Sequence, residues 1–180
     1  TMRGLDICVN VVRISSVEEA PKDSISILDP ANLNPEEVSY GQVSAVSGKA
    51  SVEWILEAGK LAVSGKIQAI ATAPIHKEAA RAAGYEAIGH MELFQELTQA
   101  EQVATMLTAG NLRVVHLTTH RSLAKAVEYV TKDNIVAKLK LTDSCFRDWG
   151  FSSPRIAVAA LNPHGGDGGL IGTEEADEIA

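Results

Sequence analysis

The chain of 180 residues is 46% hydrophobic and 22% charged, proportions that are typical of a folded globular domain. With 16 lysine and arginine residues against 23 aspartate and glutamate residues, the net charge is −7, which disfavours nucleic-acid binding through neutralised phosphates. No apolar run approaches the roughly 20 residues that cross a membrane, and the two cysteines, Cys8 and Cys145, lie in no motif, as expected in a reduced, cytoplasmic protein.

Strands are predicted at residues 5–14 and 24–28, where β-branched residues are frequent. A helix is predicted at 49–63, because apolar residues recur there every three or four positions, and Gly65 follows as a left-handed cap. A second long helix is predicted from near Thr131 to just before Gly150. Short, nearly continuous apolar runs predict three further strands, each covered on both faces, at 67–72, 112–117 and 155–161.

Strands that alternate with helices predict an α/β fold with a mainly parallel sheet and helices on both faces. The chain contains no internal repeat, low-complexity tract or linker, so residues 1–180 are expected to form a single α/β unit.

Histidines follow each of the last three predicted strands, at His76, His120 and His164. Because ligands bind at the carboxyl ends of parallel strands, His120 and His164 could point into one cleft. Neutral imidazoles in that arrangement suit zinc, cobalt or a similar divalent ion. On spacing alone, the simpler alternative of two hydrogen-bonding loop histidines without a metal is favoured. His116, within a predicted strand, is expected to pack in the core.

Four glycines fall within residues 165–169 and would let the backbone approach a ligand closely. Thr173 is predicted to cap a following helix, with Glu174 and Glu175 in its first turn. Backbone amides in this stretch could hold an anion, although the two acids would oppose it, and a plain flexible turn fits equally well. Lys77, at a predicted helix start, is either a phosphate or carboxylate ligand or a solvated surface residue.

Five short motifs together resemble the family of 4-hydroxythreonine-4-phosphate dehydrogenases, which act in pyridoxal phosphate biosynthesis. They occur in family order from about residue 40 to the end of the chain. Jointly they are far more specific than any one of them. The motifs are GKAS at 48–51, TAPIHKE at 72–78, GHME at 89–92, TTH at 118–120 and LNPHGGDGG at 161–169.

The resemblance implies an isocitrate/isopropylmalate dehydrogenase-like fold and a homodimer whose active site lies at the subunit interface. It implies oxidation of 4-phosphohydroxy-L-threonine by NAD or NADP to a β-keto acid, which decarboxylates to 3-amino-2-oxopropyl phosphate. The family's divalent metal (Zn, Mg or Co) is held by three histidines, two of which match His120 and His164. The substrate-contacting His-Thr pair of the family falls on His90 and Met91, and no catalytic residue is assigned.

The same resemblance implies that the chain is the central fragment of a larger two-domain dehydrogenase, of roughly twice its length. The third metal histidine and later substrate-binding residues of the family have no counterpart in the sequence. The isolated chain is therefore expected to be incomplete as an enzyme.

Departures from the family pattern leave the substrate open. Met91 replaces the family threonine and removes a hydroxyl that could bond the substrate, so phosphorylated threonate, phosphorylated erythronate and a terephthalate dihydrodiol remain alternatives. Asp167 stands in place of glutamate and Gly165 in place of alanine, which affects the surroundings of the metal ligands. A phosphate acyltransferase of the same fold is a further alternative, but it needs no histidine metal site.

Overall fold

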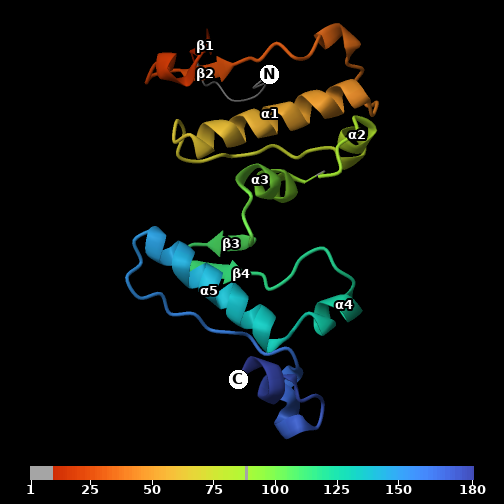
Figure 1. Cartoon of the computed structure of the whole chain (residues 1–180), viewed down its shortest axis with the longest axis vertical. Coiled ribbons are helices and arrows are strands. Elements are labelled where there is room, and N and C mark those ends of the chain that lie inside the picture. Colours follow the sequence, from red (N-terminus) through yellow and green to blue (C-terminus); the bar gives the residue numbers. More distant parts are fainter. Residues whose placement is uncertain (1–9, 88) are drawn as a thin grey trace. The chain divides into compact units, whose positions relative to one another are not determined.

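The computed structural model describes residues 10–87 and 89–180 (Figure 1). Their contacts divide the chain into two compact units, Thr1–Glu101 and Gln102–Ala180. Both units combine helices with strands, so the predicted α/β class is confirmed. That residues 1–180 act as a single unit stays a prediction. No helix within the described ranges is long and apolar enough to cross a membrane.

Helix α1 (Ala45–Val63) forms the centre of the first unit and confirms the predicted helix, although it begins before residue 49. The hydroxyl of Ser44 accepts a hydrogen bond from the backbone N–H of Ser47 (3.2 Å), which caps the first turn. Gly65 follows the helix with φ +72°, the left-handed conformation predicted for it.

Two short helices, α2 (Lys77–Ala82) and α3 (His90–Thr98), pack against α1 and bury its inner face. The core of this unit consists of Val52, Ala80 and Leu93, which are at most 2% exposed. Partly buried apolar side chains surround them: Ile55, Leu56, Ile75, Tyr85 and Ala87.

Close approach of two backbones fixes how α1 and α2 pack. Gly48 of α1 is buried, and a Cβ built on it would overlap the carbonyl group of Ala79 in α2. The absence of a side chain at this position therefore lets the two helices meet. Further along α1, a Cβ on Gly59 would meet the side-chain ends of Leu97 and Phe94.

A parallel strand pair completes the first unit. Strands β1 (Val11–Ile14) and β2 (Ile25–Leu28) pair with Val11 opposite Ile25, which confirms both predicted strands over these residues. Residues 5–9 of the first predicted strand lie outside the described residues.

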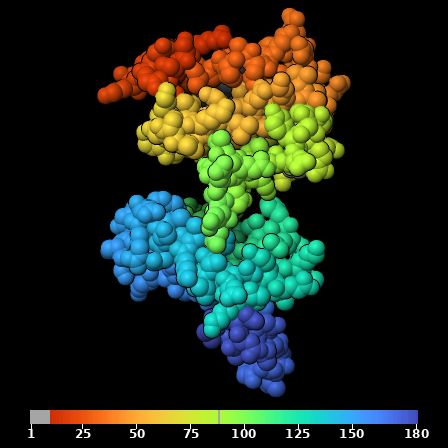
Figure 2. Space-filling view, viewed as in Figure 1, coloured from red at the N-terminus to blue at the C-terminus, as the bar shows by residue number. Residues whose placement is uncertain are grey.

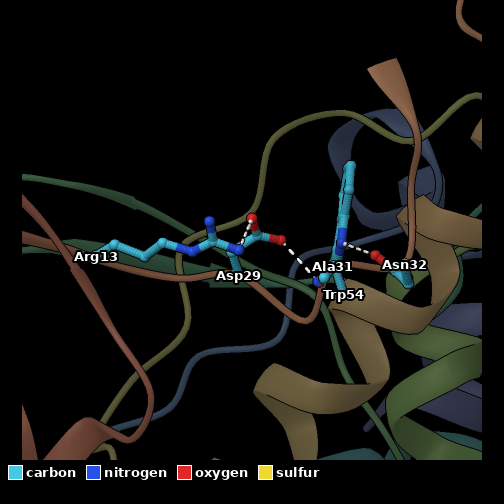
Figure 3. Close-up of polar contacts among 5 residues, drawn as sticks. All are labelled: Arg13, Asp29, Ala31, Asn32 and Trp54. Atoms are coloured by element: carbon cyan, nitrogen blue, oxygen red, sulfur yellow. Dashed lines mark hydrogen bonds and ion pairs between the residues drawn. The ribbon is translucent and has the colours of Figure 1, made fainter. Parts of the chain in front are cut away.

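Polar contacts fasten the segment after β2 (Figure 3). Asp29 pairs with the guanidinium of Arg13 (2.8 Å) and also accepts a hydrogen bond from the backbone N–H of Ala31 (2.8 Å). The side-chain oxygen of Asn32 accepts a hydrogen bond from the indole N–H of Trp54 on α1 (2.8 Å). The Asp29 ion pair thus joins the segment to β1, and the Asn32 bond joins it to α1.

The second unit contains an antiparallel hairpin in place of one of the predicted parallel strands. Strands β3 (Met106–Ala109) and β4 (Leu112–Val115) pair in antiparallel register, and β4 confirms most of the strand predicted at 112–117. The sequence prediction missed β3, whose partner strand begins only a few residues later in the chain.

Helices α4 (Leu123–Glu128) and α5 (Lys132–Asp148) follow the hairpin. Helix α5 begins directly after Thr131, as predicted, and the Thr131 side chain caps it. The guanidinium of Arg113 on β4 lies over the Phe146 ring of α5, 5.9 Å from its centroid. This cation–π contact joins the hairpin to the helix within the unit.

The predicted strands at 67–72 and 155–161 are wrong for the described structure, which assigns neither segment to a strand. A strand needs the hydrogen-bond ladder of a neighbour, and apolar sequence alone does not supply one. In the second segment, Ile156 and Val158 are correspondingly 41% and 44% exposed. Over residues 10–87 and 89–180, one parallel pair (β1–β2) and one antiparallel pair (β3–β4) stand in place of the mainly parallel sheet predicted from these segments.

The contact at Gly48 predicts different outcomes for two glycines of the same helix. In Gly48→Ala, the new methyl group meets backbone, so urea unfolding should show a loss of about 2 kcal/mol. In the control Gly59→Ala, the neighbours are the ends of movable side chains, and the gain in helix propensity of about 0.5–1 kcal/mol offsets the crowding. Equal stabilities of the two variants would contradict the close packing of α1 on α2.

Candidate active site

The loop Pro163–Gly169, which carries His164, has an unusual backbone. All six residues from 164 to 169 have positive φ, from +47° to +96°. Glycines supply four of these positions at little steric cost, but His164 and Asp167 each occupy the left-handed region at a cost of about 1–2 kcal/mol. The blue C-terminal segment in Figure 2 contains this loop, and the His164 side chain is exposed.

The imidazole of His164 faces the carboxylate of Asp167, with 3.3 Å between Nδ1 and Oδ2. A carboxylate on one ring nitrogen orients a histidine and leaves Nε2 available as a ligand. The predicted site residue His164 therefore has the orientation partner that a metal-binding imidazole needs.

His120 lies between β4 and α4 in the same unit and also has a left-handed backbone, with φ +54°. Its side chain is exposed. Non-glycine residues in this region of backbone space are uncommon and concentrate at functional sites. Both histidines predicted as metal ligands share this feature.

Acidic side chains beyond the loop hold the residue before Pro163. One carboxylate oxygen of Glu175 accepts hydrogen bonds from the backbone N–H groups of Leu161 (2.8 Å) and Asn162 (2.6 Å). The other oxygen accepts from Asn162 Nδ2 (3.0 Å), which also donates to Glu174 (2.7 Å). The Asn162 side-chain bond and the backbone bonds lower the pKa of Glu175, because all of them favour the charged carboxylate.

The sequence prediction for this acidic segment is partly wrong. Thr173 does not cap with its side chain; its carbonyl accepts hydrogen bonds from Ala176 and Asp177, and a π-helical turn follows at Glu175–Ile179. The Glu174 and Glu175 carboxylates reach back to Asn162 instead of lying free at a helix start. In the sequence, the position of two acids shortly after a glycine-rich loop is the one feature that could have indicated these contacts with Asn162.

The predicted substrate residues belong to the first unit. His90 is the first residue of α3, and its ring lies 6.4 Å from the Phe94 ring, while Met91 is exposed on the same turn. Gly89, which precedes them, is buried. The structure places His90 and Met91 together, but it assigns no role to them.

Of the other candidates, His76 has a clear structural role. His76 caps α2, because its Nδ1 accepts a hydrogen bond from the backbone N–H of Ala79 (3.3 Å), and Lys77 is exposed at the first helical position. His116 is half-buried, and its Nδ1 is covered without a hydrogen-bond partner in the structure. A core histidine usually has hydrogen-bond partners for its buried ring nitrogens, and His116 lacks one for Nδ1 among the described residues.

The donor set of the second unit fits a divalent metal in its chemistry. His120 and His164 supply imidazole nitrogens, and Asp167 supplies the orienting carboxylate. Across residues 10–87 and 89–180, however, no three His, Cys, Asp or Glu side chains gather closely enough to hold an ion.

Comparison with known proteins assigns the class. The structure aligns with 4-hydroxythreonine-4-phosphate dehydrogenase from Klebsiella pneumoniae at a TM-score of 0.88 and 36% identity, over 95% of this chain and 52% of that one. The isocitrate/isopropylmalate dehydrogenase-like α/β fold implied by the sequence motifs is thereby confirmed. The fold therefore places the chain in the isocitrate/isopropylmalate dehydrogenase-like class.

Residues 2–180 match the family model of the pyridoxal phosphate biosynthetic protein PdxA, and the chain belongs to this family. A Halalkalibacterium halodurans protein, provisionally named a D-threonate 4-phosphate dehydrogenase, is 41% identical over 97% of this chain and 52% of its own length. The 4-hydroxythreonine-4-phosphate dehydrogenase of Trichlorobacter lovleyi is 38% identical over 98% of this chain and 55% of its own length. The chain thus spans about half the length of the curated relatives it matches.

Two glycines of the left-handed loop provide a matched test of its packing. Gly166 is buried, and a Cβ there would lie 2.6 Å from the carbonyl oxygen of Gly172, whereas a Cβ on Gly168 would meet nothing within 4 Å. Both alanine variants strain the backbone, but only Gly166→Ala also creates a clash. It should lose about 1–3 kcal/mol more stability in urea unfolding than Gly168→Ala. Equal losses would show that the loop is open at Gly166.

Proposed function

We propose that the protein oxidises the secondary alcohol of a 4-phosphorylated hydroxy acid, with NAD or NADP as hydride acceptor. Membership of the PdxA family is the observation that carries this proposal. In such an oxidation, the carbinol carbon transfers a hydride to the nicotinamide and the hydroxyl loses its proton. The cofactor performs the hydride chemistry, and the protein supplies orientation and charge.

Relatives with different substrate names support two candidate substrates. The sequence motifs imply 4-phosphohydroxy-L-threonine, and the Trichlorobacter lovleyi relative carries that activity in its name. The Halalkalibacterium halodurans relative favours D-threonate 4-phosphate, which has a hydroxyl in place of the amino group. Met91 lacks the hydroxyl of the family threonine, which leaves the choice between these two substrates open.

Residues in the two units have separate roles in this proposal. His90 and Met91 at the start of α3 contact the substrate, and His120 and His164 hold a divalent ion, with Asp167 orienting His164. A bound ion of this kind lowers the pKa of a coordinated hydroxyl and stabilises negative charge on oxygen. The exposed, left-handed positions of both histidines support their role as ligands.

The product of oxidation determines a second step. Removing the hydride from the carbon β to the carboxylate yields a β-keto acid, which loses carbon dioxide. With 4-phosphohydroxy-L-threonine the final product is 3-amino-2-oxopropyl phosphate, and this reaction is a step of pyridoxine phosphate biosynthesis.

We further propose that the enzyme is cytoplasmic and works as a homodimer with a shared active site. The dehydrogenase names of the relatives favour oxidation over phosphate acyl transfer.

A panel of substrates tests the activity. We expect the whole protein that contains this chain, supplied with zinc or magnesium, to reduce NAD or NADP with D-threonate 4-phosphate or 4-phosphohydroxy-L-threonine and to release one carbon dioxide for each reduced nicotinamide. The terephthalate dihydrodiol and the acyltransferase reaction of acetyl-CoA with phosphate serve as comparison arms. Reduction with neither phosphorylated acid, or acetyl phosphate formation instead, would contradict the proposal.

Metal analysis tests the two histidine ligands. We expect His120→Ala and His164→Ala each to lower the zinc content of the purified protein at least tenfold, because each removes a donor. His76→Asn is the matched control, since it removes an imidazole while asparagine keeps the helix cap. Zinc contents that match the unaltered protein in both alanine variants would rule the site out.

A further inference from the structure

The loop that carries His164 needs an external restraint. Its left-handed residues include two that are not glycine, and such backbone persists only where surrounding contacts over-determine it. Within the loop, the backbone contributes a bond from the N–H of Gly165 to the carbonyl of Asn162 (3.2 Å). A second bond leads from the N–H of Ile171 to the carbonyl of Gly166 (3.3 Å). The N–H of Leu170 donates to the same Gly166 carbonyl. None of these bonds involves the N–H groups of Leu161 and Asn162, at the approach to the loop, which other groups hold.

Glu175 provides that restraint. Its carboxylate accepts three hydrogen bonds, two from successive backbone N–H groups and one from the Asn162 side chain. Hydrogen bonds to a charged acceptor are about twice as strong as neutral ones. Because they fix both the backbone and the side chain of Asn162, they set the direction in which the chain turns into Pro163 and His164.

The packing of the loop on the same carboxylate is a second, independent observation. A Cβ on Gly166 would lie 3.3 Å from Oε2 of Glu175 and 2.6 Å from the Gly172 carbonyl. The Glu175 side chain therefore contacts the loop at its start, at Leu161 and Asn162, and faces it again in the middle, at Gly166.

We propose that Glu175 is a positioning residue, which holds the left-handed loop in place and thereby sets the position of the His164 imidazole. The part of this inference that concerns metal binding rests on the proposed function. Glu175 touches neither His164 nor a reacting atom, so it acts through Asn162 and Gly166.

Neighbouring acids provide graded controls. Glu174 accepts a bond only from the Asn162 side chain, and Glu178 accepts from the backbone N–H of Lys132 at the start of α5 (2.6 Å). Asp177, in the same π-helical turn, is exposed and makes no side-chain hydrogen bond to the described residues. The substitution Asp177→Asn therefore removes a charge from this turn without affecting the loop.

Amide hydrogen exchange tests the restraint without reference to activity. We expect Glu175→Ala to raise the exchange rates of the Leu161 and Asn162 amides at least tenfold, and Glu175→Gln to raise them less, because its one oxygen still accepts. Asp177→Asn should leave them unchanged. Amides of α5 are the internal control, since their rates rise only if the unit unfolds as a whole. Unchanged rates at Leu161 and Asn162 in Glu175→Ala would overturn the proposal.

Zinc titration of the same variants tests the consequence for His164. We expect the dissociation constant for zinc to rise about tenfold in Glu175→Ala and less in Glu175→Gln, with melting temperatures that stay close to that of Asp177→Asn. Faster exchange with unchanged zinc affinity would overturn the effect on His164. If the unaltered protein binds no zinc, the proposed metal site fails, and the exchange rates alone decide the role of Glu175.

Discussion

The candidate metal-binding loop depends on one constraint, the left-handed backbone that runs from His164 to Gly169. Such a run is unfavourable for L-residues, and four glycines make it sterically accessible. The same run brings the Asp167 carboxylate within 3.3 Å of Nδ1 in the His164 ring. The orientation of the imidazole therefore depends on the unfavourable backbone conformation. Its persistence requires contacts from outside, which the Glu175 carboxylate supplies.

In the first unit, close backbone packing has a comparable role. The buried Gly48 lets α2 approach α1, and this contact brings Ala80 into the core with Val52 and Leu93. The segment between the two helices ends at His76, whose ring caps α2. Within the motifs at 48–51 and 72–78, Gly48 and His76 thus have roles in packing and capping.

Much of the helical structure could be predicted from the sequence. Periodic apolar residues and caps located α1 and α5, because both signals are local along the chain. The segments 67–72 and 155–161 were predicted as strands from apolar composition, yet strand formation depends on neighbours that composition does not reveal. Strand β3 was missed for the converse reason: its signal lies in its pairing with β4.

The candidate ligands could be selected from the sequence, because histidines that follow apolar runs are visible there. The contacts that orient His164 could not be predicted from the sequence. Asp167 and Glu175 act through backbone conformation and through bonds to residues more distant along the chain. Such contacts have no periodic or spacing signature. The glycines of the loop indicated unusual backbone, but not the left-handed run that only the structure shows.

Anomalous diffraction at the zinc absorption edge, from crystals grown with zinc, tests the central claim most directly. The account predicts one peak about 2.0–2.1 Å from an imidazole nitrogen of both His120 and His164, the usual zinc–nitrogen distance. A zinc peak bound to neither histidine, or to only one of them, would contradict the assignment of this pair as the metal site.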